Sequence, residues 1–207
     1  MKKLILAIVL LGTTFINAQD RYSKGMKKAF ELWQNQKVIE ASNMFERIAT
    51  AEPDKWLPYY YVAQINTVIS FGEKDEDKLS KQLEKAKEFL DVAKAISPDN
   101  PEILVQEALI NTAWIAFDGA TYGMTMSQKN VQLYQKALEL DPNNPRVVFS
   151  KAEWDMGAAR YFGKDTAPYC KDVERALELF ATFKSETPFY PTMGKERAEE
   201  ILENCGK

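Results

Sequence analysis

Apolar residues recur at steps of three and four along this chain, with charged residues between them, and the pattern repeats about every 45 residues. Each repeat closes with a proline, at Pro53, Pro98, Pro142 and Pro188. An alanine follows ten residues after each proline, at Ala63, Ala108, Ala152 and Ala198. Steps of three and four place apolar side chains on one face of a helix. A fixed period of this size therefore predicts an array of stacked helix pairs.

Each repeat divides into two predicted helices. First helices are expected from about Trp56 to Ser70, Pro101 to Phe117 and Pro145 to Tyr161, because a glycine follows each end closely and can take the left-handed cap conformation. Polar residues beyond each glycine are expected to cap the second helices: Asp75, Asp77, Thr125, Ser127, Asp165 and Thr166. A last helix, from about Pro191 to Asn204, is expected to cap the array.

Residues 1–18 have the pattern of a secretory signal peptide. Lys2 and Lys3 form a basic start, an apolar run follows from Leu4, and Ala18 precedes the polar Gln19. The apolar stretch is shorter than the roughly 20 residues that span a bilayer, and a retained anchor is the alternative. We expect cleavage after Ala18 and a periplasmic or secreted protein without a transmembrane segment.

Composition excludes several functions. Removing residues 1–18 takes two lysines, which leaves 25 Lys and Arg against 30 Asp and Glu, so nucleic-acid binding is not expected. The chain has no histidine, which excludes Ser-His and Cys-His nucleophilic sites and histidine-ligated zinc. Glu153 and Asp155, two residues apart on a helix, point to different faces. We therefore expect no enzyme, no cofactor and no metal site.

The repeated positions resemble the tetratricopeptide repeat family. The small residues of that motif match Ala29, Ala63, Ala108 and Ala152 in the first helices and Ala41, Ala86, Ala93, Ala137 and Ala176 in the second. Its large apolar position matches Phe45, Leu90, Tyr134 and Phe180. The period exceeds the family's usual length of about 34 residues, which indicates longer helices and loops. Asn130 replaces a small residue in the third repeat, which predicts a splayed or polar helix pair there.

The resemblance implies an all-α fold, a right-handed α-solenoid of about four helix pairs with a C-terminal capping helix. The expected units span residues 22–55, 56–100, 101–144 and 145–190, and the cap spans 191–205, all within one domain from residue 19 to 207. An unrelated helical bundle is the alternative.

In this family the first helices line a concave groove, so the resemblance implies a partner-binding surface there. The groove-facing candidates are mainly apolar or aromatic: Met26, Phe30, Trp33, Tyr60, Gln64, Thr67, Val105, Leu109, Thr112, Phe149, Glu153, Met156 and Arg160. The lysine and asparagine pair with which some members hold a peptide carboxylate is not matched at these positions. Two interpretations stay open, because such a stripe suits either a binding groove or ordinary core packing. The aromatic group around Trp56, Tyr59, Tyr60 and Tyr61 has two interpretations of its own: packing at the joint between the first two units, or a platform for a sugar or a proline-rich segment.

Two function hypotheses follow. The first is an exported interaction module that binds an unidentified protein or peptide partner in the cell envelope through its concave surface. The alternative is a periplasmic binding protein for an apolar small molecule or lipid held between the helix pairs.

The two cysteines are expected to form a disulfide. Cys170 and Cys205 lie almost symmetrically in sequence on either side of Pro188, so antiparallel helices would bring both sulfur atoms to the same end. Export places the chain where disulfides persist. Two free thiols are the alternative, and a redox-active pair is disfavoured because there is no CxxC motif.

Overall fold

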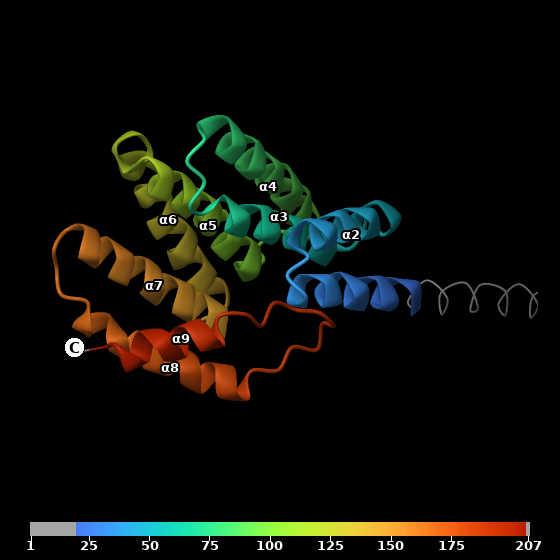
Figure 1. Cartoon of the computed structure of the whole chain (residues 1–207). Helices are drawn as coiled ribbons and strands as arrows, with labels where there is room; N and C mark the ends of the chain where they lie inside the picture. Colours follow the sequence, from blue (N-terminus) through green and yellow to red (C-terminus); the bar gives the residue numbers. More distant parts are fainter. Residues whose placement is uncertain (1–19, 206–207) are drawn as a thin grey trace, which may run out of the picture.

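The structure is a computed structural model that describes residues 20–205, and over this range the fold is all-α (Figure 1). An N-terminal helix occupies residues 20–34. It is followed by α2 (Val38–Ala51), α3 (Trp56–Ser70), α4 (Glu76–Ile96), α5 (Pro101–Phe117), α6 (Gly119–Leu140), α7 (Pro145–Tyr161), a 3-10 turn (Ala167–Tyr169), α8 (Cys170–Thr182) and α9 (Lys195–Glu203). The predicted signal peptide, residues 1–18, lies outside the described residues.

The three first helices begin and end where the sequence predicts. Pro101 and Pro145 open α5 and α7, where a missing backbone N–H costs no hydrogen bond. Asn100 caps α5 by accepting from the backbone N–H of Glu102, and Asn144 caps α7 by accepting from that of Arg146. The two near-identical turns therefore end one helix pair and begin the next in the same way.

Two predicted helix starts are wrong. Helix α6 begins at Gly119, because the Asp118 side chain accepts hydrogen bonds from the backbone N–H groups of Ala120 and Thr121. Thr125 and Ser127 therefore lie inside α6 and do not cap it. The last helix begins at Lys195 and not near Pro191, because the preceding residues run across the first helices. Gly194, with a φ of 116°, makes the change of direction.

The other predicted caps have a mixed outcome. Asp75 caps α4 by accepting from the backbone N–H of Lys78, while Asp77 lies within the first turn of that helix. The Asp165 carboxylate accepts from the backbone N–H of Ala167 in the 3-10 turn that precedes α8, and the Thr166 side chain makes no capping bond. The prediction that these two residues cap the second helix is therefore wrong for α8, which begins at Cys170. The prediction that a polar residue beyond the glycine caps the second helix is therefore correct for the repeat at residues 56–100. In the two following repeats the second helix is not capped by the predicted residues.

Helices pack as hairpins, α3 with α4, α5 with α6 and α7 with α8, and α3, α5 and α7 also contact one another in order. Both helices of each of these pairs carry a fully buried alanine, at Ala63, Ala86, Ala108, Ala137, Ala152 and Ala176. A side chain without atoms beyond Cβ lets two helix backbones approach closely, which is why alanine recurs at this period.

The pair of α5 and α6, which is the third predicted repeat, has a polar interior, as the presence of Asn130 predicts. Its side chain is fully buried and donates to the backbone carbonyl of Ala108 and to the hydroxyl of Thr112. The Asn111 amide donates in turn to the Asn130 carbonyl oxygen. These bonds satisfy a buried amide that would otherwise destabilise the fold.

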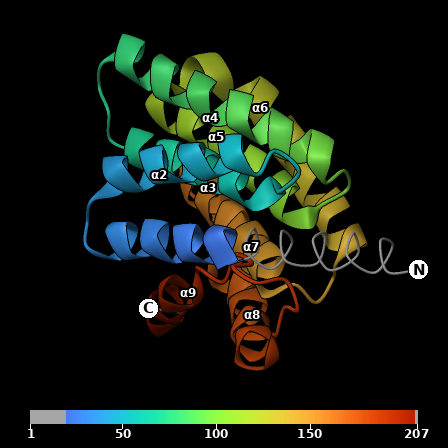
Figure 2. The ribbon, with the colours of Figure 1, turned by 90° about the vertical axis from the view of Figure 1, so that its right-hand side faces the viewer.

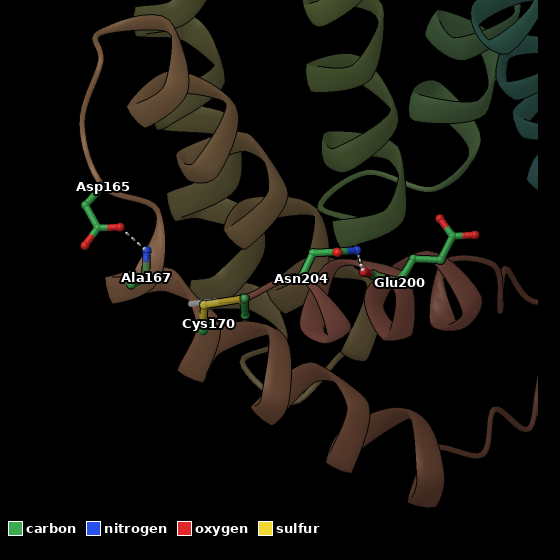
Figure 3. The surroundings of a disulfide bond; sticks show 6 residues. Asp165, Ala167, Cys170, Glu200 and Asn204 are labelled. Atoms are coloured by element: carbon green, nitrogen blue, oxygen red, sulfur yellow. Dashed lines mark hydrogen bonds between the residues drawn. A yellow bond between two sulfur atoms is a disulfide. The ribbon is translucent and has the colours of Figure 1, made fainter. Parts of the chain in front are cut away.

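The predicted disulfide is confirmed. Cys170 opens α8 and Cys205 follows α9, and their Cα atoms lie 5.9 Å apart across the bond (Figure 3). Near the bridge, the Asn204 side chain donates to the backbone carbonyl of Glu200. The bridge therefore fixes the C-terminal end of α9 to the start of α8.

Among residues 20–205, no helix is both long enough and apolar enough to cross a membrane.

Candidate ligand-binding site

The structure divides the predicted groove residues by burial. The buried members are Met26, Tyr60, Gln64, Thr67, Val105, Phe149 and Met156. The half-buried members are Phe30, Trp33, Leu109, Thr112 and Glu153, and Arg160 is exposed. In this conformation the buried members contribute to the core, so a partner would reach them only after a rearrangement. For the others, partner binding stays a prediction.

Residues 183–194, named here the crossing segment, pack against part of the predicted groove. The segment leaves α8, runs to the N-terminal helix and returns to α9 (Figures 1 and 2). The Phe189 ring stacks on Phe30 with ring centroids 6.1 Å apart and meets the edge of Tyr22 at 6.0 Å. The Tyr190 ring packs against Trp56 at 6.1 Å. The aromatic group at the start of α3 therefore packs against the protein's own chain.

A buried polar network joins the crossing segment to the first helices. Arg146, whose side chain is 9% exposed, donates from Nε to the carboxylate of Glu102 at 2.7 Å. Its two other guanidinium nitrogens donate to the backbone carbonyl of Met193 at 2.7 Å and to the Tyr60 hydroxyl at 3.0 Å. Asn144 donates to the second oxygen of Glu102 at 2.9 Å. Every charged atom of this pair has a partner, as a buried ion pair requires.

Burial also raises tyrosine pKa values on this face. Desolvation raises the pKa of Tyr60 above its ordinary range, against the opposing effect of Arg146. Desolvation, with the nearby carboxylates of Glu52 and Asp54, raises the pKa of Tyr22 to about 12. These tyrosines are therefore neutral hydrogen-bonding or packing groups at physiological pH.

The opposite end of the helix pairs has a different surface. This surface, named here the hairpin edge, consists of the loops and helix ends at residues 68–75, 113–124 and 160–164, on the upper-left side of Figure 1. Large apolar side chains are exposed along it: Phe71 is 41% exposed, Met124 89%, Tyr161 76% and Phe162 69%. Tyr161 and Phe162 pack on each other, with ring centroids 5.1 Å apart. Exposed apolar side chains in one region are typical of binding surfaces.

A cavity of 360 Å³ opens on the hairpin edge. It is lined by Ser70 at the end of α3, by residues 71–74 of the α3–α4 connection, by Leu79 of α4, and by Ala113, Ala116 and Phe117 of α5. The two alanines on the last turns of α5 leave the space, and Gly72, at φ 88°, has no atom within 4 Å of where a Cβ would lie. This volume lies within the range of small-molecule sites, which begins at roughly 300 Å³.

Within the described range no group of three or more His, Cys, Asp or Glu residues is placed to hold a metal ion. The arrangement at the cavity offers ring contacts and one cationic side chain, Lys74. It is suited to holding a small molecule and offers no pair of groups for acid–base chemistry.

No protein-family profile and no curated protein sequence matches the chain. Among solved structures, the chain is similar to a haemophore. That structure is the HusA haemophore from Porphyromonas gingivalis, with a TM-score of 0.78 and 21% sequence identity. The alignment covers 89% of this chain and 92% of the haemophore. At this identity the likeness establishes a shared fold.

The sequence predictions did not include the crossing segment, the buried network or the hairpin edge. A signal for the network exists, because Glu102 and Arg146 each follow the proline that opens a first helix, in consecutive repeats. Opposite charges at equivalent positions of neighbouring repeats can pair when the repeats stack. The aromatic residues of the hairpin edge were recognised only as helix ends.

Proposed function

We propose that this protein is exported and binds a small, flat, apolar ligand, with haem as the first candidate. The observation that carries the proposal is the shared fold with a haemophore over about nine-tenths of both chains. Fold alone does not define a ligand, and the surfaces of this chain supply the further support. The crossing segment packs against part of the predicted groove, whereas the hairpin edge has exposed rings and an open cavity.

Export is supported by two features of the chain. Residues 1–18 have the pattern of a signal peptide. The Cys170–Cys205 disulfide is the kind of bond that persists in an oxidising compartment. Fractionation of source cells, with mass analysis of the mature N-terminus, tests this part: the expected first residue is Gln19, and an intact Met1 in the cytoplasm would contradict it.

The chain has no histidine, so a bound haem would have no histidine on its iron. Ligation would fall to another side chain such as tyrosine or methionine, or binding would depend on ring contacts and ion pairs alone. The proposal therefore concerns transport or storage of the ligand, with no chemistry on it.

Titration with haemin, followed by the Soret absorbance, tests the function. We expect saturation at a fixed molar ratio and an increase in unfolding temperature, because a ligand that binds only the folded state stabilises it. Urea-unfolded protein is the control for non-specific adsorption. A linear, unsaturable change that the unfolded protein reproduces would overturn the proposal.

Binding of a protein partner is the second candidate function. It is favoured by Tyr161 and Phe162, which are 76% and 69% exposed and contact each other at the α7–α8 end of the hairpin edge. Aromatic residues of this kind are common at the centres of protein interfaces. We also propose, from the repeated alanines and prolines, that the helix pairs are divergent tetratricopeptide repeats. Crosslinking in intact source cells, with the Phe162→Ser variant as control, would capture one recurring envelope protein if this candidate is correct.

A further inference from the structure

The two ends of the helix pairs differ in what they offer a ligand. At the starts of the first helices, Arg146 and Glu102 satisfy each other and the crossing segment covers the aromatic side chains. A ligand there would have to displace Phe189 and Tyr190 together with their hydrogen bonds. At the hairpin edge, the cavity is already open and its aromatic walls need no rearrangement.

The walls of the cavity suit a flat apolar ring. Phe71 and Phe117 come from the ends of α3 and α5, two helices that pack on each other. Phe117 packs partly against the main core, so its position is fixed, while Phe71 is 41% exposed. Ala116 is exposed on the same turn and leaves the mouth open. A planar ligand entering here gains ring contacts without unfolding any helix.

One cationic side chain of the cavity lining, Lys74, can pair with a carboxylate on that ligand. Among the described residues the Lys74 ammonium makes no ion pair, whereas Lys78 lies near Asp75 at 3.9 Å. The one acidic side chain of the lining, Glu73, already accepts backbone hydrogen bonds from Lys74 and Asp75. These bonds hold the Glu73 carboxylate in its ionised form against the loop backbone and lower its pKa. Lys74 is the one cation of the lining that an incoming carboxylate can pair with.

We infer that this cavity is the ligand site, and that it takes a flat apolar ring bearing a carboxylate, with Phe71 and Phe117 beside the ring and Lys74 on the carboxylate. The inference rests on the proposed function and names its site. Haem meets the description, because its ring carries propionate groups.

The test is haemin titration of the whole protein and of matched variants. Ala116→Phe adds a ring at the cavity mouth, and Lys74→Glu reverses the charge. The controls are Ala95→Phe, which makes the same change at an exposed position of α4 away from the cavity, and Lys129→Glu on α6. We expect each cavity variant to weaken haemin binding at least about tenfold and each control to match the wild type. The unfolding temperature of every variant shows whether it is folded.

The outcomes separate the site from the function. Saturable binding by the wild type with unchanged binding by folded Ala116→Phe and Lys74→Glu would overturn the site and leave the proposed function in place. A third variant, Phe71→Ala, covers the case in which the ring added by Ala116→Phe itself holds haemin. Unchanged binding by this variant as well would confirm that the cavity is not the ligand site. No saturable binding by the wild type would overturn both.

Discussion

The face against which the crossing segment packs and the hairpin edge lie at the two ends of the same helices. They differ in the exposure of their aromatic rings and in whether their charged side chains have partners. At the crossing-segment face, aromatic rings meet other rings of the chain, and the buried Arg146–Glu102 pair has its hydrogen-bond partners within the chain. At the hairpin edge, Phe71, Tyr161 and Phe162 are exposed, and Phe71 lines an open cavity together with Phe117. The comparison shows that aromatic content does not identify a site: what matters is whether the chain satisfies its own side chains.

The largest effect is expected at the buried ion pair. Arg146→Ala leaves the Glu102 carboxylate buried without its cation, and we expect a loss of about 3–5 kcal/mol in the free energy of unfolding. Urea denaturation measures it. Arg197→Ala is the matched control, because that arginine also pairs with a glutamate but is 57% exposed, and its loss should stay within about 1 kcal/mol.

The double variant Glu102→Met with Arg146→Met tests whether the loss of stability comes from the unpaired carboxylate. Replacing both charges removes the buried unpaired carboxylate, so part of the lost stability should return. If the double variant is less stable than Arg146→Ala, hydrogen bonding to Met193 and Tyr60 outweighs charge balance in this network.

The second effect concerns the disulfide that fixes the end of α9. Removing it with Cys170→Ser and Cys205→Ser together should lower the free energy of unfolding by about 2–4 kcal/mol, since the bond closes a long loop in the unfolded chain. Denaturation of the wild type with and without reductant measures the same loss in the free energy of unfolding. The double variant should show no response to reductant.

A smaller effect is expected from the crossing segment itself. Phe189→Ala removes ring contacts with Phe30 and Tyr22 from a half-buried position, and we expect a loss of about 1–2 kcal/mol, below the cost of truncating a fully buried phenylalanine. Phe162→Ala at the hairpin edge should change stability by no more than about 0.5 kcal/mol. Equal losses from both variants would remove the distinction between the two faces.

The last effect, confined to alkaline solution, is a pH dependence at Tyr22. Its pKa is raised to about 12 in the folded state, mainly by burial, whereas an unfolded tyrosine titrates near its ordinary value. The neutral form is thus favoured by folding, and this contribution is complete below about pH 10 and is lost as pH rises toward about 12. Thermal unfolding from pH 9 to 12 should show a steeper decline for the wild type than for Tyr22→Phe. Parallel curves would contradict it.

Much of the fold could be predicted from local sequence. The starts of α5 and α7 were correct because proline and asparagine act within one helical turn, and the ends of α3 and α7 are followed by Gly72 and Gly163 at positive φ, as predicted. The predicted glycine cap is wrong for α5, because Gly119 is the first residue of α6. The start of α6 was wrong because Asp118 competes for the cap and lies nearer than Thr125 or Ser127. Capping is decided by hydrogen-bond geometry over two or three residues, which spacing rules resolve only in part.

The candidate site was less predictable. Counting from the closing turns indicated which residues lie on the first helices, and it gave no information on what covers them. Phe189 and Phe30 lie near opposite ends of the chain, and nothing local to either residue brings the two rings together. The hairpin edge consists of three connections from separate repeats, so no single stretch of the sequence could predict it.

The sequence by itself determined the all-α class, the helix pairing through its period and alanines, and the partners of the disulfide. These properties follow from local propensity and from a pattern repeated at fixed spacing. Only the tertiary structure decided which aromatic residues are covered, because that depends on the crossing segment returning from the end of the chain to its beginning. Burial is a property of the assembled helices, so one repeated pattern gives a packed face at one end of the helices and an open cavity at the other.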